Sequence, residues 1–369
     1  MEERYLECFD EGCVLAKPVK GPKMLFLELT TRCNLNCVMC YRNSWKEKLG
    51  DISEKLFNKV LEDAIEAGVE FVWLAGWGEP LAHPKFLEFA EKVKDEGLKL
   101  GVNTNGLLLD EYVAEKLMKI GIDRVAVSVD AADPEAYGSI RRGDFYRLMR
   151  ALESLHKAKK ELGKTYPILE FAFTLMLDNL KEAMPLIDLA VQHGVGRVII
   201  SNVIPVTEYM IDKCVYALNG KVNLEEFVSK LAIKSLETNV GVRLPEFSLK
   251  TERRCDFIEN SATCVTWDGK VTPCYNFLHS YTSYIYGREK KIEQVVFGDV
   301  TKESLKDIWF KLDYVKFRYK VRFFRYPSCT DCKFHEICDF AQSNLMDCWG
   351  NQPSCADCLY SRRIVQCPI

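Results

Sequence analysis

Three closely spaced cysteines constrain this chain more than any other feature. Cys33, Cys37 and Cys40 occur at C-x3-C-x2-C spacing, directly after the apolar run at 24–29. Three thiolates on one short loop can hold three corners of an iron–sulfur cube and leave the fourth iron open to a substrate. A structural zinc site needs four closed ligands, usually as two C-x2-C pairs. Three buried structural cysteines are the remaining alternative, and they leave the spacing unexplained.

The composition favours metal ligation for the other cysteines as well. The chain has 369 residues, of which 48% are hydrophobic and 16 are cysteines, and its opening residues lack the pattern of an export signal. We therefore expect a cytoplasmic protein whose cysteines bind metal, with disulfides as a minority alternative because hyperthermophile cytosols can contain them. The net charge of −3 gives no electrostatic basis for binding nucleic acid. The apolar runs are too short to span a membrane.

Strand-like apolar runs alternate with helical patterns through the first half of the chain. The predicted strands cover residues 24–30, 71–75, 98–103, 124–130, 168–176 and 197–203. The predicted helices between them cover residues 53–67, 84–96, 110–120, 145–162 and 180–193. Parallel neighbours need long crossovers, so this order predicts an α/β fold with a parallel sheet. The sheet is either a partial (β/α)6 TIM-like barrel, with its active site at the carboxyl ends of the strands, or a doubly wound open sheet.

The composition changes along the chain and divides it into four parts. Ten of the 16 cysteines lie in the last 115 residues, where helical periodicity is sparse apart from 302–312. Such a segment would fold around metal, because it has little periodic core of its own. The predicted parts are an N-terminal arm (1–22), an α/β core (23–210), a bridging region (211–254) with a helix at 224–237, and a cysteine-rich domain (255–369).

The cysteine loop, with Tyr41 directly after its third cysteine, resembles that of the radical S-adenosylmethionine (SAM) enzymes. This resemblance implies the barrel, a [4Fe–4S] cluster with an open iron, and SAM as the second cofactor. It also implies the chemistry. The cluster passes one electron to the sulfonium of SAM, and the resulting 5′-deoxyadenosyl radical takes a hydrogen atom from the substrate.

Further stretches at the ends of predicted strands match the family in order. The run 76–80 resembles the family's Gly-Gly-Glu motif, which meets the amino group of SAM, although Trp77 interrupts the two glycines. Arg141 or Arg142 stands where the family places an arginine on the carboxylate of SAM. The full set of expected SAM contacts is Tyr41, Gly76, Trp77, Gly78, Glu79, Asn103, Asn105, Ser128, Asp130, Arg141, Asn202 and Ile204. Each stretch alone has an ordinary alternative, such as a glycine turn, an Asn-Gly turn or a solvated arginine.

The C-terminal cysteine spacing resembles the SPASM extension, which carries two auxiliary [4Fe–4S] clusters. Gln342 stands where that family usually has a cysteine. The resemblance implies a first ligand set of Cys255, Cys264, Cys274 and Cys348. It implies a second set of Cys329, Cys332, Cys338 and Cys358, with Cys355 and Cys367 as rivals for the last ligand in each. A zinc ribbon built from two C-x2-C pairs is the alternative.

The closing run 347–359 and the run 76–80 together resemble the maturases associated with tungsten-containing aldehyde:ferredoxin oxidoreductases. This implies an enzyme that acts on a pterin-type small molecule or on a tungsten oxidoreductase, with an electron donor such as ferredoxin. A radical SAM enzyme that crosslinks or oxidises a ribosomal peptide is the first alternative, and a non-enzymatic iron–sulfur electron carrier or zinc scaffold is the second. Trp77 is a candidate aromatic face for the pterin ring, with plain packing as its alternative. No catalytic residue is assigned, although Asp256 and Tyr275 are candidates for an acid–base group.

Overall fold

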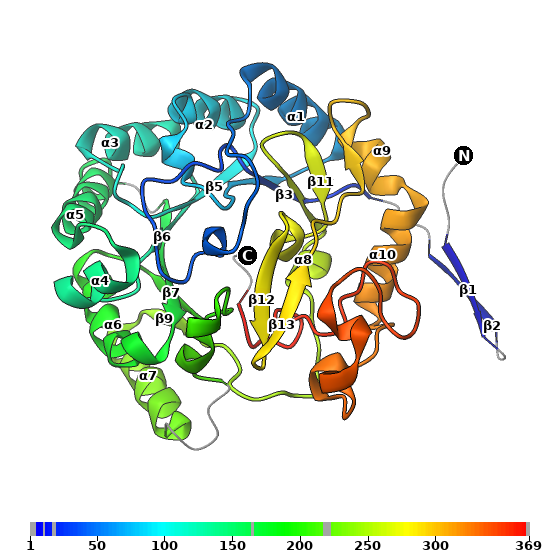
Figure 1. Cartoon of the computed structure of the whole chain (residues 1–369). Helices are drawn as coiled ribbons and strands as arrows, with labels where there is room; N and C mark the ends of the chain where they lie inside the picture. Colours follow the sequence, from blue (N-terminus) through cyan, green and yellow to red (C-terminus); the bar gives the residue numbers. More distant parts are fainter. Residues whose placement is uncertain (1–4, 10–11, 17–19, 164–165, 217–222, 367–369) are drawn as a thin grey trace.

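A curved sheet with helices on its outer side forms the body of the molecule. The computed structural model describes residues 5–9, 12–16, 20–163, 166–216 and 223–366. Its main sheet has ten strands in the order β14-β11-β10-β3-β4-β5-β6-β7-β8-β9. The strands from β10 to β9 are parallel, and β11 and β14 add antiparallel pairs at one end. Figure 1 shows helices α1 to α7 in a ring around the sheet, as a partial barrel requires.

The six predicted core strands and the five predicted core helices are confirmed, with different ends. The parallel strands are β3 (Met24–Leu27), β4 (Phe71–Leu74), β5 (Lys99–Thr104), β6 (Arg124–Ser128), β7 (Ile168–Leu175), β8 (Arg197–Asn202), β9 (Gly241–Arg243) and β10 (Ala262–Val265). The helices are α1 (Glu54–Ala67), α2 (Phe86–Asp95), α3 (Glu111–Ile120), α4 (Pro134–Arg141), α5 (Phe145–Glu161), α6 (Ala183–Gln192) and α7 (Leu224–Thr238). Helix α4 was not predicted. In the part of the chain that the structure describes, no helix is long and apolar enough to cross a membrane.

Side-chain caps explain where the core helices begin and end. The hydroxyl of Ser53 accepts a hydrogen bond from the N–H of Leu56 at 3.2 Å, which satisfies a donor that the first turn of α1 leaves unpaired. Gly68 ends α1 with φ of 82°, a conformation that glycine adopts without steric cost. The inner faces of the helices are apolar, and the rings of Phe57 and Phe89 stack between α1 and α2 with centroids 3.8 Å apart. The caps and the apolar faces together fix each helix against the sheet.

The cysteine-rich C-terminal region shares the main sheet with the barrel. Strand β10 pairs in parallel with β3, and β11 (Lys270–Thr272) and β14 (Gly298–Asp299) continue the sheet beyond it. The region also contains α8 (Asp256–Glu259), the hairpin β12–β13 (Tyr281–Ile285 and Arg288–Ile292), α9 (Leu305–Phe310) and α10 (Leu312–Arg322). The predicted helix at 302–312 therefore divides between α9 and the start of α10, most of which was not predicted. After α10 the described helices are short 3₁₀ turns.

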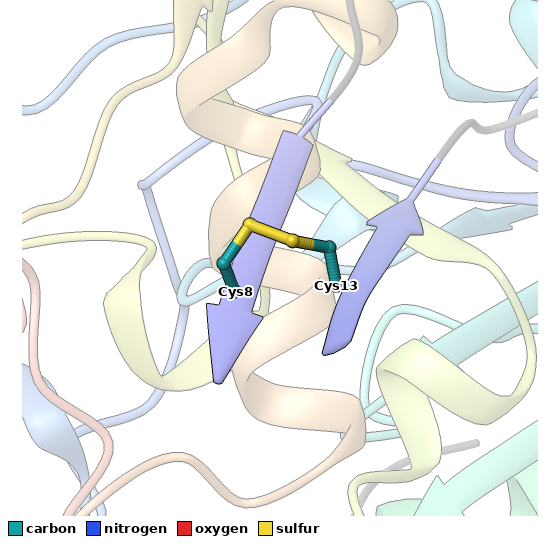
Figure 2. The surroundings of a disulfide bond; sticks show 2 residues. All are labelled: Cys8 and Cys13. Carbon is teal, nitrogen blue, oxygen red and sulfur yellow. A yellow bond between two sulfur atoms is a disulfide. The ribbon is translucent and has the colours of Figure 1, made fainter. Parts of the chain in front are cut away.

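The N-terminal arm contains a disulfide-linked hairpin. Strands β1 (Tyr5–Phe9) and β2 (Gly12–Ala16) pair antiparallel, with Cys8 directly opposite Cys13. The two cysteines form a disulfide with their Cα atoms 4.0 Å apart (Figure 2). Most cysteines were expected to bind metal, with disulfides as the lesser alternative. This pair follows that alternative.

Candidate functional site

The loops that follow the parallel strands surround one cavity at the carboxyl edge of the sheet. Its volume is about 300 Å³, which lies at the lower end of the usual range for ligand pockets. The predicted residues that line it are Cys33, Cys37, Cys40, Tyr41, Gly76, Trp77, Gly78, Glu79, Asn103, Asn105, Ser128, Arg141, Asn202 and Ile204. The structure thus brings together every predicted residue of the three-cysteine and SAM sites except Asp130.

The three-cysteine loop is held in place by hydrogen bonds to its backbone and sulfurs. The amide of Asn43 donates to the carbonyls of Cys37 and Val38 at 3.0 and 2.8 Å. The sulfur of Cys33 accepts from the N–H of Leu35 at 3.4 Å. Burial raises the pKa of the Cys37 thiol to about 11, and it raises the pKa values of the Cys33 and Cys40 thiols as well. Cluster assembly must therefore release protons from these thiols, because the ligand form is the thiolate.

The loop after β4 brings a buried carboxylate to the cavity. A Cβ atom on Gly78 would lie 2.2 Å from the carbonyl oxygen of Thr30, so only glycine fits this close approach. The carboxylate of Glu79 accepts hydrogen bonds from the hydroxyl of Thr104 and the N–H of Asn105, both at 2.7 Å. Burial raises the pKa of Glu79, while these hydrogen bonds favour its ionised form. A carboxylate held in this way is placed to accept hydrogen bonds from an ammonium group.

Arg141 lines the cavity with a buried acidic partner behind it. Its Nη1 atom lies 3.9 Å from the sulfur of Cys37, and its Nε atom donates to the carboxylate of Asp130. Asp130 is fully buried and also accepts from the N–H of Thr174 at 2.6 Å. The prediction placed Asp130 among the SAM contacts. In the structure it lies outside the cavity lining and orients Arg141 instead, whereas the neighbouring Arg142 is exposed at the end of α4.

Unsatisfied polar atoms around the cavity fit a polar ligand. The side-chain oxygens of Asn103 and Asn202 and the indole nitrogen of Trp77 are buried without a hydrogen-bond partner among the described residues. All three residues line the cavity. Buried polar atoms are normally paired, so these atoms indicate partners supplied by a bound molecule. Together with the three thiols and the buried carboxylate of Glu79, they fit a cluster and SAM.

Trp77 belongs to an aromatic cluster at the rim of the cavity. Its ring stacks on Tyr41 with centroids 4.9 Å apart, and it makes edge contacts with Trp45 and Tyr281 at 5.7 and 5.2 Å. Tyr41 therefore covers one face of the indole. These contacts are what we expect if Trp77 serves only to pack the core. Stacking of a pterin ring on Trp77 stays a prediction.

Four cysteines of the C-terminal region line a second, apolar cavity. They are Cys255, Cys274, Cys355 and Cys358. The predicted first set differs, because it contained Cys264 and Cys348. Cys264 lies within β10, is fully buried in the sheet and is not part of this cavity wall. Cys355 takes its place because the N–H of Cys358 bonds to the carbonyl of Cys355 at 3.3 Å, a tight turn that brings both residues to the cavity.

The second predicted set contained Cys329, Cys332, Cys338 and Cys358. Burial raises the pKa of the Cys329 thiol, and the negative charges of Asp357 and Cys348 raise it further, while Lys290 opposes them. Cys358, which the prediction gave to this set, lines the other cavity instead. Cys329, Cys332 and Cys338 lie on the 3₁₀ turns that follow α10, and Cys348 is exposed. The rival ligand Cys367 lies outside the described residues.

Zinc was the alternative metal for the cysteines of this protein. A zinc ion needs its four ligands within about 2.3 Å of one point. Among the described residues, no group of three or more His, Cys, Asp or Glu side chains is arranged to hold a single metal ion.

Two tyrosines form a shared wall between the two cavities. Tyr275 and Tyr360 line both the cavity at the strand ends and the cavity of Cys255 and Cys274. The hydroxyl of Tyr360 lies 2.7 Å from that of Tyr41, next to Cys40. Of the two acid–base candidates, Tyr275 therefore reaches the cavity, whereas Asp256 is paired with Arg243 at 2.7 Å and lies elsewhere.

Sequence reasoning missed three residues that support the site. Tyr360 lies two residues after Cys358, and no motif in the sequence marked it as part of the site. Glu28 and His279 form a buried pair at 2.9 Å beneath the Gly76–Glu79 loop. Glu28 could have been noticed because it is the one charged residue inside the apolar run 24–29. A carboxylate buried in such a run needs a partner, which indicates a structural role.

Comparison with known proteins assigns the chain to a family. The family model for the radical SAM superfamily matches residues 27–170, and that for the SPASM iron–sulfur cluster-binding domain matches residues 255–333. The tungsten-containing aldehyde ferredoxin oxidoreductase cofactor-modifying protein of Pyrococcus furiosus is 40% identical over 350 residues, which cover 94% of this chain and 97% of that protein. The chain belongs to the same family of radical SAM proteins. This radical SAM enzyme accordingly binds a [4Fe–4S] cluster and SAM, and its SPASM domain binds auxiliary iron–sulfur clusters.

More distant proteins share parts of this radical SAM enzyme. A probable GTP 3′,8-cyclase of Methanococcus maripaludis is 39% identical over 119 residues, which are 32% of this chain and 39% of that protein. The crystal structure of Streptococcus suis SuiB bound to S-adenosylmethionine superposes with a TM-score of 0.62 at 16% identity, over 89% of this chain and 73% of that one. The second likeness shows a common fold. The predicted fold class, enzyme class and cofactors are thereby confirmed.

Proposed function

We propose that this radical SAM enzyme matures a tungstopterin cofactor or the aldehyde oxidoreductase that carries it. One observation supports this above all others. The relative whose name states such a role is 40% identical to this chain along 97% of its own length. When bound, the cluster and SAM supply reductive cleavage of SAM to a 5′-deoxyadenosyl radical, which abstracts hydrogen from the substrate.

We infer that the residues around the first cavity divide the work of binding and orientation. Cys33, Cys37 and Cys40 hold the cluster. The carboxylate of Glu79 accepts hydrogen bonds from the ammonium group of SAM. Arg141, oriented by Asp130, binds the carboxylate of SAM. Polar groups of Asn103, Asn105, Ser128 and Asn202 serve the ribose and adenine, with Ile204 as an apolar contact. Tyr275 and Tyr360 close the wall toward the C-terminal region and exclude water there.

We assign the auxiliary clusters to cysteine sets revised from the predicted ones. Cys255, Cys274, Cys355 and Cys358 hold the first, because all four line one cavity. Cys329, Cys332, Cys338 and Cys348 hold the second, because Cys355 and Cys358 line that cavity and Cys348 is the remaining cysteine that the structure describes after Cys338. The barrel up to residue 210 then carries SAM, and the region from residue 255 carries both auxiliary clusters.

We also propose a cytoplasmic location and an iron–sulfur electron donor such as ferredoxin. The exposed position of Cys348 supports this donor, because electron transfer needs close approach to a cluster. Trp349, directly after Cys348, is 64% exposed, and Ile337, directly before Cys338, is 81% exposed. The partner oxidoreductase named for the Pyrococcus relative is the proposed recipient of the product.

The test is to supply the reduced, reconstituted enzyme and SAM with a pterin precursor, and separately with small peptides encoded nearby. We expect the pterin to stimulate release of 5′-deoxyadenosine and to change mass. The Cys40→Ala variant, treated identically, controls for turnover that does not come from the first cluster. A mass change in a peptide, without stimulation by any pterin or oxidoreductase, would establish the peptide-modifying alternative instead.

A further inference from the structure

The peptide group between Gly76 and Trp77 is held from two sides by residues outside its own loop. The hydroxyl of Tyr275 donates a hydrogen bond to the carbonyl oxygen of Gly76. The N–H of Trp77 donates to the Oε1 atom of Glu28 at 3.0 Å. Because both bonds go to one planar unit, they fix its position and its orientation.

Glu28 is in turn held by the C-terminal region. Its carboxylate is fully buried and lies 2.9 and 3.1 Å from the Nε2 atom of His279. The Nδ1 atom of His279 lies 2.9 Å from Glu47, which also accepts the N–H of Ser280 at 2.9 Å. Each ring nitrogen faces a carboxylate, so both nitrogens carry protons and the imidazole is cationic. A buried carboxylate is expensive without such a partner, so the pair forms a fixed unit.

Little space is left around this unit. A Cβ atom on Gly76 would lie 2.4 Å from Cγ of Glu28, so the backbone rests directly on the carboxylate side chain. The rings of Trp77 and His279 are in contact, with centroids 5.1 Å apart. The same loop continues to Gly78 and Glu79, which line the cavity, so a shift at Gly76 would be carried along the loop toward Glu79.

We propose that Tyr275 and His279 are positioning residues for SAM binding. Through them, the SPASM region clamps the Gly76–Trp77 peptide and sets the place of Glu79. The C-terminal region thus completes the SAM site of the barrel, in addition to carrying its own clusters. This inference rests on the proposed role of Glu79 in binding the ammonium group of SAM.

The test measures SAM affinity in the anaerobically reconstituted full chain by equilibrium dialysis. Tyr275→Phe removes one hydroxyl, and His279→Gln removes the charge while keeping a hydrogen-bonding group. We expect each to raise the Kd for SAM about fivefold, with iron content unchanged, since each loses a hydrogen bond that orients the loop. The double variant should raise the Kd by less than the product of the two single effects, because both act on one peptide group.

Two matched variants control for general loss of packing. Tyr314→Phe removes a buried hydroxyl that bonds to Thr263, and His83→Gln alters a buried histidine that bonds to the carbonyl of Ile52. Both should leave the Kd within about twofold of the wild type. Equal effects of the controls, or an unchanged Kd in both Tyr275→Phe and His279→Gln, would overturn the clamp.

A further variant separates this inference from the proposed function. Glu79→Gln should raise the Kd for SAM more than either clamp variant, because it removes the charge that pairs with the ammonium group. An unchanged Kd in Glu79→Gln would mean that the SAM site itself is misplaced. A raised Kd in Glu79→Gln with no effect of Tyr275→Phe and His279→Gln would refute only the clamp.

Discussion

The two cysteine-rich regions of this protein are assembled in different ways. Cys33, Cys37 and Cys40 lie on one loop between β3 and α1, at the edge of a confirmed sheet. The cysteines of the apolar C-terminal cavity come from both sides of β10 and β11 and from the closing segment of the chain. The first site is local in sequence, whereas the second exists only when distant segments have packed together.

This difference separates cluster binding from folding in the two regions. The loop of the first site lies on a sheet that has its own core, so we expect the barrel to fold without the cluster. After α10 the described chain consists mainly of turns, and such a segment depends on its metal ligands for order. Loss of a cysteine in the first region should therefore abolish SAM cleavage with little effect on stability. Loss of a ligand cysteine in the second region should lower both the iron content and the unfolding temperature.

The largest expected effect is at the first site. Cys40→Ala should abolish release of 5′-deoxyadenosine from SAM with dithionite as reductant, because SAM cleavage needs the cluster with the open iron. Thermal unfolding should change little, since the loop adds no strand or helix to the core. The measurement is product analysis by chromatography beside circular dichroism. Retained SAM cleavage would mean that another set of cysteines holds the reactive cluster.

Within the C-terminal region, two cysteines should behave oppositely. Cys355→Ala should lose about four irons per chain and unfold at a lower temperature, because it removes a ligand of the first auxiliary cluster. Cys264→Ala should keep its iron, because that thiol is buried in β10 and does not line the cavity. Iron analysis of the two purified variants makes the comparison. The reverse outcome would restore the ligand set implied by the sequence resemblance.

The stability that the His279 pair contributes at the junction of the two regions should depend on pH. Burial lowers the pKa of His279, but hydrogen bonds to Glu28 and Glu47 outweigh it and raise the pKa to about 9. A raised pKa stabilises the fold fully below pH about 6.5, by about 3 kcal/mol, and this contribution is lost as pH rises through about 9. The gap in melting temperature between wild type and His279→Gln should therefore narrow as pH rises from 6 to 9.5. A gap that is constant over this range would contradict the charged pair.

The smallest expected effect lies within the first site. Arg141→Lys keeps the charge but loses the planar fork, so the Kd for SAM should rise about tenfold without loss of iron. Arg142→Lys is the matched control, because that side chain is exposed at the end of α4. Equal affinities in the two variants would show that Arg141 does not bind the carboxylate of SAM.

The sequence predicted the elements and residues whose signals are local. The alternation of strands and helices, the cysteine loop and the polar groups at strand ends all follow from short spacings, and the structure brings them around one cavity. Helix α4 was missed because it is short and has few periodic apolar residues. Helix α10 was missed for a different reason, since it is apolar on several faces and packs Tyr314, Phe317 and Val321 inside.

Pairings between distant segments could not be predicted in the same way. The proposed exchange of Cys348 and Cys358 between the two auxiliary sets depends on how the closing turns pack against the rest of the region. The pairing of β10 with β3 likewise depends on contacts far apart in the chain. Asp130 was placed on SAM because its position at a strand end was visible, while its bond to Arg141 was not.

Counting metal ions tests most directly whether one three-cysteine site lies beside two four-cysteine sites. After anaerobic reconstitution, the wild type should contain about 12 irons per chain, as three [4Fe–4S] clusters require. The variant with Cys33, Cys37 and Cys40 all replaced by alanine should retain about eight. Stoichiometric zinc together with only about four irons in the wild type would contradict the two auxiliary clusters.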